Sequence, residues 1–268
     1  MKKVSIVQLN RYPVKSLGGI SLTTANLEEN GITFDRNWLV TLPSGKFLTQ
    51  REIPRMALVK TAITEKGDLT LSADGRSDIT VAHTVHKGNA EYKRVTVWKD
   101  EVYAIDEGDS VAEWLSEFLE TKCRLVKMKG GFKRPIIDEG KEFEGSVRFQ
   151  DQYPLLVVSL ASLAALNEKL ETHVPMNRFR PNIVIDGCEA FEEDEFKTLS
   201  TSSVTLTSAK PCARCVITTT DQRTAERSVE PLKTLATFRS SENGVLFGQN
   251  LLVTKSGNLS VGDELTAE

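Results

Sequence analysis

The sequence predicts a mainly β protein in two parts, with a few short helices. Short runs of β-branched and apolar residues recur along the chain, and turns rich in Gly, Asp and Pro separate them. Only a few segments have helical periodicity. At 268 residues the chain is longer than one ordinary domain and long enough for two, each with its own core.

The first half consists of predicted strands followed by one helix. The turns "PSGK", "EKGD" and "ADGR" separate several of the strands. An amphipathic helix is predicted at residues 110–121, where Ser110 and Glu113 have the spacing of a capping box. The predicted strands cover residues 4–9, 38–42, 56–63, 69–73, 79–83, 94–98 and 101–105.

The segment 129–152 is Gly-rich, charged and without periodicity, so we expect a linker or a long loop over a site. We place the domain boundary near its start, which divides the chain into residues 1–125 and 126–268. The second part is also mainly β, with a helix at 160–171 that Ser159 caps and a short helix that Pro231 opens. Its β-type segments are residues 154–159, 182–187, 204–209, 215–220 and two strands within 249–265.

Composition and charge exclude several classes of protein. The 34 basic and 37 acidic residues nearly balance, so the chain has no excess of positive charge that would bind a phosphate backbone. We therefore expect no nucleic-acid partner. The longest apolar run, residues 155–166, is too short to span a membrane. The N-terminus has no long apolar segment typical of a signal peptide. We therefore expect a cytoplasmic protein without a membrane anchor.

The stretch "KPCARCVITTTDQ" places Cys212 and Cys215 at CxxC spacing before a β-branched run. A structural zinc site would need about four ligands, and no second Cys or His pair supplies them. A redox disulfide of the thioredoxin type would stand before a helix, which this run does not predict. A single working thiolate and a pair of buried, inert thiols remain open.

Several basic residues stand in turn-like contexts where a core strand would not hold them. Each alone is typical of a solvated surface charge. As a set beside a soft thiolate, they indicate a metal held by sulfur and an anionic group held by guanidinium groups. The set comprises Lys15, Arg36, Arg51, Arg178 and Arg180.

These segments also carry a family resemblance that covers nearly the whole chain. "YPVKSLGG", "DRNW" and "TQRE" resemble the N-terminal β-barrel domain of MOSC-domain proteins. "NRFRPNIVIDG", "KPCARCVITTTD", "FGQNL" and "VGDEL" resemble the MOSC domain itself. Within the family, the chain is most similar to the bacterial YcbX-type proteins and the mitochondrial amidoxime-reducing components. The resemblance implies a β-barrel-rich fold, with a MOSC N-terminal β-barrel domain at 1–125, a MOSC domain at 126–268, and molybdenum cofactor (Mo-molybdopterin) between them.

The resemblance also implies a role for individual residues. Cys215 matches the catalytic thiolate that ligates molybdenum, whereas Cys212 does not, so the CxxC spacing is incidental. The implied cofactor-binding residues are Lys15, Ser16, Arg36, Arg51, Asp151, Arg180 and Asn182.

The implied function is a molybdenum-cofactor-dependent oxidoreductase that reduces N-hydroxylated compounds such as amidoximes, hydroxylamines and hydroxylated nucleobases. The chain has no four-cysteine cluster motif for the C-terminal ferredoxin domain of the YcbX-type proteins, so we expect a separate iron–sulfur, flavin or haem protein to supply electrons. Two alternatives stay open. One is a carrier of sulfur or of molybdenum cofactor that acts through a Cys215 persulfide or thiolate. The other is a β protein that only binds an anionic small molecule.

Overall fold

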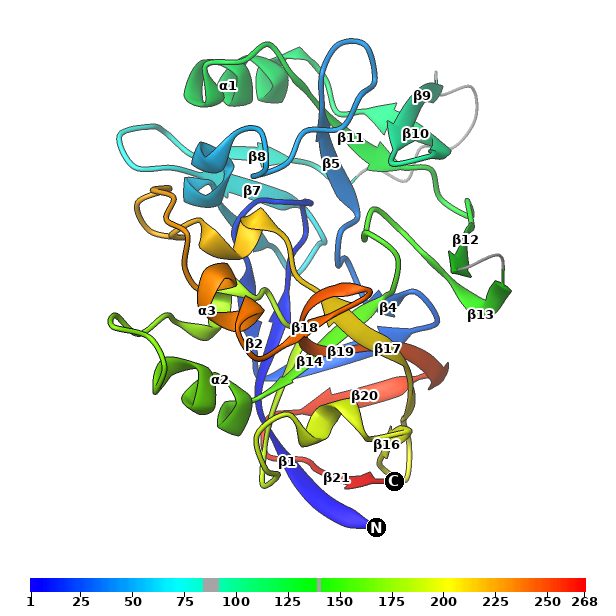
Figure 1. The fold of residues 1–268 in the computed structure, drawn as a ribbon. Coiled ribbons are helices and arrows are strands. Elements are labelled where there is room, and N and C mark those ends of the chain that lie inside the picture. The colour runs from blue at the N-terminus through cyan, green and yellow to red at the C-terminus, as the bar shows by residue number, and fades with distance from the viewer. Residues whose placement is uncertain (84–91, 139–140) are drawn as a thin grey trace.

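The computed structural model describes residues 1–83, 92–138 and 141–268, and its main feature is a closed barrel (Figure 1). Seven strands form the ring, because β19 pairs with β14 after the path has passed through every other member. In hydrogen-bonded order they are β14 (Leu155–Ser159), β15 (Ile183–Asp186), β1 (Lys2–Arg11), β21 (Glu264–Ala267), β16 (Thr198–Ser200), β17 (Thr205–Ala213) and β19 (Gly244–Lys255). The mainly β prediction is confirmed.

The first strand of the chain closes the barrel of the second half. β1 runs antiparallel to β15 on one side and to β21 on the other, which places the two termini side by side (Figure 1). Its side chains Val4, Ile6 and Leu9 are buried in the barrel core. The boundary between residues 125 and 126 stays a prediction, and β1 pairs across it.

Two of the other strands extend the barrel sheet, β2 beside β1 and β18 beside β19, and the rest form smaller sheets. β5, β11, β10 and β9 form one antiparallel sheet, and β6, β7 and β8 form another. The remaining strands are β2 (Ile20–Leu22), β3 (Thr24–Glu28), β4 (Gly31–Ile32), β5 (Trp38–Thr41), β6 (Lys60–Ile63), β7 (Leu69–Ser72), β8 (Ile79–Val81), β9 (Tyr92–Val97), β10 (Asp100–Asp106), β11 (Arg124–Met128), β12 (Arg134–Asp138), β13 (Lys141–Val147), β18 (Ser240–Ser241) and β20 (Gly257–Ser260).

The described residues form three α-helices and four short 3₁₀ helices. None of these helices combines the length and apolarity that a membrane crossing requires. They are α1 (Asp109–Leu119), α2 (Leu160–Asn167), α3 (Leu232–Ala236), η1 (Pro54–Leu58), η2 (Met176–Arg178), η3 (Glu192–Asp194) and η4 (Val216–Thr219).

The helix ends test two predicted caps. Ser159 caps α2, because its hydroxyl accepts a hydrogen bond from the Ser162 N–H at 3.0 Å. The cap predicted at Ser110 is wrong: α1 begins one residue earlier, after Gly108. The glycine has a φ of 99°, a backbone conformation that a serine rarely adopts.

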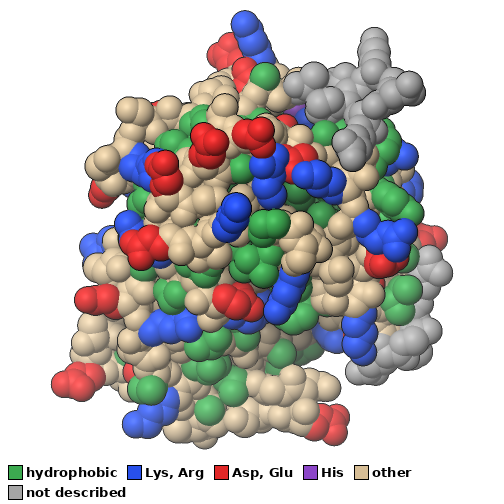
Figure 2. Space-filling model, turned by 90° about the horizontal axis from the view of Figure 1, so that it is seen from above, with side chains coloured by type: hydrophobic (Ala, Val, Ile, Leu, Met, Phe, Trp, Pro, Cys, Tyr) green, Lys and Arg blue, Asp and Glu red, His purple; other side chains and the backbone are tan. Residues whose placement is uncertain are grey.

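Three segments differ from their predicted conformation. Residues 56–58 belong to the 3₁₀ helix η1, although a strand was predicted at 56–63, and the strand β6 begins only at Lys60. Residues 129–152 contain the hairpin of β12 and β13, and the chain after it, residues 148–152, runs to the site described below. Residues 216–219 form the 3₁₀ helix η4 where a β-type run was predicted. Acidic and basic side chains are interspersed on the face seen in Figure 2, as the balanced charge of the sequence indicates.

Candidate active site

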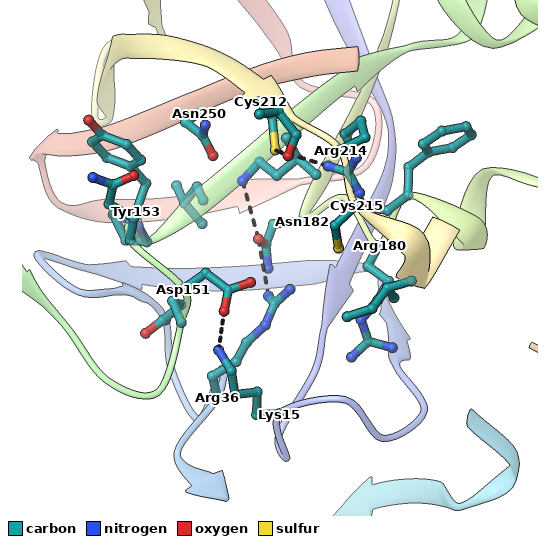
Figure 3. Close-up of a pocket in the computed structure, with 18 of the residues that line it drawn as sticks. Lys15, Arg36, Asp151, Tyr153, Arg180, Asn182, Cys212, Arg214, Cys215 and Asn250 are labelled. Atoms are coloured by element: carbon teal, nitrogen blue, oxygen red, sulfur yellow. Dashed lines mark hydrogen bonds and ion pairs between the residues drawn. The ribbon is translucent and has the colours of Figure 1, made fainter. Parts of the chain in front are cut away.

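One cavity of about 330 Å³ gathers Cys215 and all seven implied cofactor-binding residues (Figure 3). Arg178, the fifth member of the basic set, does not line it, because its guanidinium forms an ion pair with Asp221 at 2.9 Å. The residues come from loops that lie far apart in the sequence and from both halves of the chain. The predicted residues that line it are Lys15, Ser16, Arg36, Arg51, Asp151, Arg180, Asn182 and Cys215. Their proximity makes one joint site possible, whereas their individual roles stay predictions.

Cys215 stands at the end of β17, where the chain turns into η4. Its carbonyl oxygen accepts hydrogen bonds from the N–H and the hydroxyl of Thr218, at 3.1 and 3.0 Å. These bonds close the first turn of the 3₁₀ helix. The half-buried Cys215 side chain therefore lines the cavity from a fixed backbone.

Cys212 also lines the cavity, but its sulfur has a protein partner. Arg214 donates from Nη1 to the Cys212 sulfur at 3.0 Å and from Nη2 to the Phe179 carbonyl at 2.7 Å. All four cysteines are free thiols. The CxxC spacing therefore places both sulfurs at the same site, and Arg214 links the Cys212 sulfur to the backbone at Phe179.

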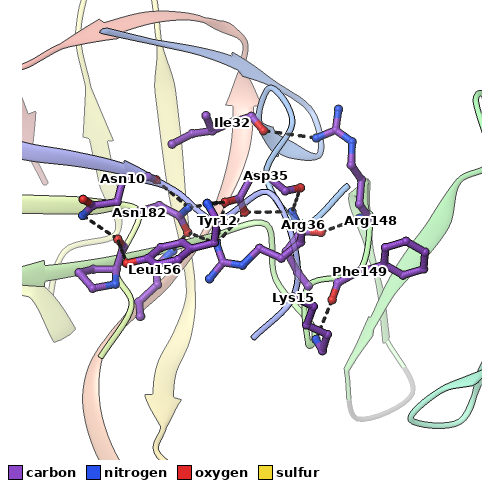
Figure 4. A network of polar contacts seen from close by, with 12 residues as sticks. Asn10, Tyr12, Lys15, Ile32, Asp35, Arg36, Arg148, Phe149, Leu156 and Asn182 are labelled. Atoms are coloured by element: carbon purple, nitrogen blue, oxygen red, sulfur yellow. Dashed lines mark hydrogen bonds and ion pairs between the residues drawn. The ribbon is translucent and has the colours of Figure 1, made fainter. Parts of the chain in front are cut away.

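A buried carboxylate organises the part of the cavity near Arg36 (Figure 4). Asp35 is fully buried, and its oxygens accept two hydrogen bonds from Arg36 Nη1, at 2.6 and 2.9 Å. The same carboxylate accepts bonds from the Tyr12 N–H at 2.8 Å and from Asn182 Nδ2 at 3.2 Å. Asp35 thus holds two predicted site residues in position.

Tyr12 supports two arginines through its ring. The guanidinium groups of Arg36 and Arg180 lie 4.4 and 4.2 Å from the ring centroid, within the range of cation–π contacts. Burial raises the pKa of the Tyr12 phenol to about 12. Its ring is therefore a neutral platform for both charges at neutral pH.

Arg180 brings a positive charge to the cavity, where Asp35 and Asp151 attract it. Its Nη2 atom is buried and has no hydrogen-bond partner among the described residues. Burial lowers the pKa of its guanidinium to about 10, so it remains protonated at neutral pH. A buried polar group without a partner costs free energy, which a bound anion would relieve.

Lys15 and Asp151 form the second charged group of the site. The Lys15 ammonium donates to Asp151 Oδ1 at 2.7 Å and to the Phe149 carbonyl at 2.6 Å. Burial lowers the pKa of Lys15 to about 8 against the attraction of Asp151. The Asp151 side chain keeps 55% of its surface exposed, and desolvation within the cavity acts to raise its pKa. The charges of Lys15 and Arg51 outweigh this effect and hold the pKa of Asp151 well below its usual range.

Backbone strain is concentrated around the cavity. Eight described residues other than glycine have a positive φ, and four of them line it. Such conformations cost about 1–3 kcal/mol each and are most common at functional sites. The four residues are Ser16, Arg36, Trp98 and Arg180, with φ values of 68°, 45°, 57° and 55°.

The lining residues fit an anionic group that carries a sulfur-bound metal. Six basic side chains line the cavity against one acidic side chain, Asp151, and Arg180 has an unpaired donor. The described residues contain no group of three or more His, Cys, Asp or Glu that could hold a metal ion. A metal at Cys215 would therefore bring most of its own ligands, and a thiolate suits such a soft metal.

Sequence reasoning gave no role to several polar and aromatic residues that line the cavity. They include Trp98, Tyr153, Lys210, Arg214 and Asn250. Lys210 and Arg214 lie in "KPCARCVITTTDQ" and Asn250 in "FGQNL", but those motifs were interpreted only for their cysteines and for the family resemblance. Trp98 and Tyr153 belong to no interpreted motif, and a contact between an aromatic ring and a cation leaves no pattern in the sequence.

The comparisons with known proteins match both parts of the chain. The model of the MOSC N-terminal beta barrel domain matches residues 3–122, and that of the MOSC domain matches residues 144–266. Mitochondrial amidoxime-reducing component 1 of Homo sapiens is 35% identical over 97% of this chain and 81% of its own length. Mitochondrial amidoxime reducing component 2 of Rattus norvegicus is 35% identical over 94% of this chain and 80% of its own length. The protein of the same name from Bos taurus is 35% identical over 97% of this chain and 82% of its own length.

The prediction of a cytoplasmic protein is contradicted by these relatives, which are mitochondrial proteins by name. That prediction depended on the composition and the polar N-terminus, and neither encodes the compartment in which a folded domain works. The identity and coverage show instead that the chain belongs to the family of MOSC-domain proteins that includes the mitochondrial amidoxime-reducing components.

Proposed function

We propose that this chain binds molybdenum cofactor in the cavity and reduces N-hydroxylated compounds with electrons from a separate protein. One observation carries the proposal. A free thiol, Cys215, lines the same cavity as six basic side chains, and one of these, Arg180, has an unpaired buried donor. The relatives are named for amidoxime reduction, which supports the same reaction class here.

The lining residues divide into two groups by chemistry. Cys215 would provide the thiolate for the metal. The cationic groups and the polar groups between them would bind the phosphate and the pterin by charge-assisted hydrogen bonds. This second group is Lys15, Ser16, Arg36, Arg51, Arg180 and Asn182, with Asp151 orienting Lys15 and Arg51. When bound, the cofactor would supply two-electron oxygen-atom chemistry.

The chain itself contributes positioning and charge. Conversion of an N–OH bond to N–H releases water and consumes two electrons and two protons. The Lys15 ammonium donates a hydrogen bond to Asp151, with 2.7 Å between Nζ and Oδ1, and both residues line the cavity. The asymmetric charge of the lining favours an anionic bound group and keeps its position fixed before the substrate arrives.

The direct test is cofactor content followed by turnover. Protein produced in a host that makes molybdenum cofactor should contain molybdenum and pterin, and should reduce benzamidoxime to benzamidine with reduced methyl viologen as donor. Protein from a host unable to make the cofactor is the control, and it should do neither. Absence of molybdenum from the first preparation would contradict the proposal.

The carrier alternative is less well supported. Sulfur transfer requires that a partner reach a Cys215 persulfide, whereas Cys215 is half-buried in a cationic cavity. Mass spectrometry after exposure to a cysteine desulfurase tests it. Sulfane sulfur on Cys215 together with an absence of reductase turnover would favour the carrier.

A further inference from the structure

Trp98 is an exposed aromatic residue at the cavity. It lies between β9 and β10 in a two-residue turn, since Val97 pairs directly with Asp100. The residue keeps 47% of its surface accessible, whereas Trp38 and Trp114 are buried. Trp98 also lines the cavity that contains Cys215. Tyr153 and Phe179 also line the cavity but are buried, so Trp98 is the exposed aromatic side chain among its described lining residues.

The turn holds Trp98 in a conformation that a tryptophan rarely adopts. Its φ of 57° falls at the first position of the hairpin turn, where glycine is preferred. Asn or Gly would suit that position better, so local turn chemistry does not explain the tryptophan. An unfavourable backbone conformation at a functional cavity indicates that the side chain has a role there.

Three contacts fix the orientation of the indole. Its Nε1–H donates to Asp151 Oδ1 at 2.9 Å, and the Arg51 guanidinium lies 4.7 Å from the ring centroid. The Phe47 ring meets it edge to face, with centroids 5.2 Å apart. A ring held in this way is preorganised, so little side-chain entropy is lost when a ligand packs against its exposed part.

We propose that Trp98 determines substrate specificity by packing against the flat ring of an aryl-substituted N-hydroxylated compound. The inference rests on the proposed function and narrows its substrate class. The six basic side chains of the cavity suit the anionic cofactor, and the exposed indole of Trp98 offers a flat aromatic face against which a neutral ring can stack. The protein should therefore have a higher kcat/KM for aryl amidoximes than for alkyl amidoximes that carry the same N-hydroxyamidine group.

The test uses two substrates that differ only in this ring. Benzamidoxime and acetamidoxime share the N-hydroxyamidine group and carry phenyl and methyl, respectively. Steady-state kinetics with reduced methyl viologen should show that Trp98→Leu lowers kcat/KM for benzamidoxime about five- to tenfold, mainly through KM. The same variant should change kcat/KM for acetamidoxime less than about twofold. Trp98→Phe keeps an aromatic ring and should stay within about twofold of wild type on both substrates.

The control variant is Tyr103→Leu. Tyr103 is an equally exposed aromatic residue of β10, at 45%, but it is not among the residues that line the cavity. Tyr103→Leu should leave kcat/KM unchanged for both substrates. Molybdenum content, measured for every preparation, normalises the rates.

Two results would overturn the inference while the proposed function stands. Equal losses on both amidoximes, in Trp98→Leu and Trp98→Phe alike, would show that Trp98 only holds Asp151 through its N–H. Unchanged kinetics on benzamidoxime in Trp98→Leu would show that no ring contact exists. A wild-type protein that contains molybdenum and reduces neither amidoxime would instead overturn the proposed function, and this inference with it.

Discussion

The two cysteines of the site differ in what surrounds their sulfur atoms. Cys212 packs against an apolar cluster that includes Phe179 and Phe247, and its sulfur accepts a hydrogen bond from Arg214. Cys215 lies beyond the end of β17, on the first turn of η4. The two positions therefore allow a matched comparison of thiol function.

Cys215→Ser should lose molybdenum, whereas Cys212→Ser should retain most of it. A serine alkoxide is a harder ligand than a thiolate and hardly forms near neutral pH. Metal analysis of both variants, purified from the same cofactor-producing host, measures the difference. Equal loss of metal in the two variants would show that the cysteines act as a pair.

We predict that Lys15 makes anion binding to the cavity dependent on pH. Burial lowers its pKa from 10.5 to about 8, and only the protonated form attracts an anion. Sulfate keeps a constant charge across this range, so it is a suitable probe for the cofactor-free protein. Its affinity, measured by calorimetry, should fall about tenfold between pH 7 and pH 9 as the binding-competent fraction decreases. Lys15→Met should bind sulfate weakly at both pH values, and a similar decrease in that variant would assign the titration to another group.

At the scale of elements, the loop between β4 and β5 depends on Asp35. Replacement by Asn keeps the shape but removes the charge that Arg36 requires in a largely buried position. Removal of one member of a buried ion pair costs about 3 kcal/mol. Asp35→Asn should therefore lower the free energy of unfolding by about that amount in urea denaturation.

The control for Asp35 is Asp74→Asn. Asp74 forms an ion pair with Lys60, but both side chains are mostly exposed, so the pair contributes little. No measurable change in stability is expected there. Equal stability of the two variants would indicate that the Asp35 network does not hold the loop.

Gly19 provides the space for the ring on which two arginines pack. A Cβ atom at this position would lie 2.5 Å from the Tyr12 ring, closer than any van der Waals contact. Gly19→Ala should displace Tyr12 and with it Arg36 and Arg180, so molybdenum content should fall together with the melting temperature. Gly130→Ala is the control, because its Cβ would meet nothing within 4 Å. Retention of molybdenum in Gly19→Ala would show that the ring platform is dispensable.

At the scale of the whole molecule, the described residues contain no second redox centre. Their side chains supply no group of three or more His, Cys, Asp or Glu that could hold a metal. The sequence has no GxGxxG spacing for a dinucleotide, and its four cysteines cannot both ligate molybdenum and build a four-thiolate cluster. Each turnover of the proposed reaction would nevertheless consume two electrons.

We therefore predict that the cofactor-loaded protein does not oxidise NADH or NADPH by itself. An assay that mixes the protein, benzamidoxime and NADH should show no turnover, while reduced methyl viologen in place of NADH restores it. Complexes between electron-transfer partners usually have small interfaces and short lifetimes, so no stable complex with a donor protein is required. Sustained turnover with NADH alone would reveal a redox site that the described residues do not display.

The sequence by itself determined the mainly β class and the eight candidate residues of the site. Alternating apolar residues and turn chemistry are local signals, and motifs such as "YPVKSLGG" and "KPCARC" are contiguous. Local signals gave the wrong conformation where hydrogen bonds to neighbouring residues outweigh the β propensity of the side chains. Residues 216–219 are β-branched, yet they form a 3₁₀ helix whose first turn Thr218 closes onto the Cys215 carbonyl.

Only the tertiary structure decided how the parts meet. The pairing of β1 with β15 and β21, and the positions of Trp98 and Arg214 at the cavity, join residues far apart in the sequence. Barrel closure selects the pairings of β1, because every strand edge must find a partner. The packing of the separate sheet of β9 and β10 beside the barrel brings Trp98 to the cavity. No single segment encodes these arrangements, so the cationic surplus around Arg180 became visible only when both halves of the chain were assembled around one cavity.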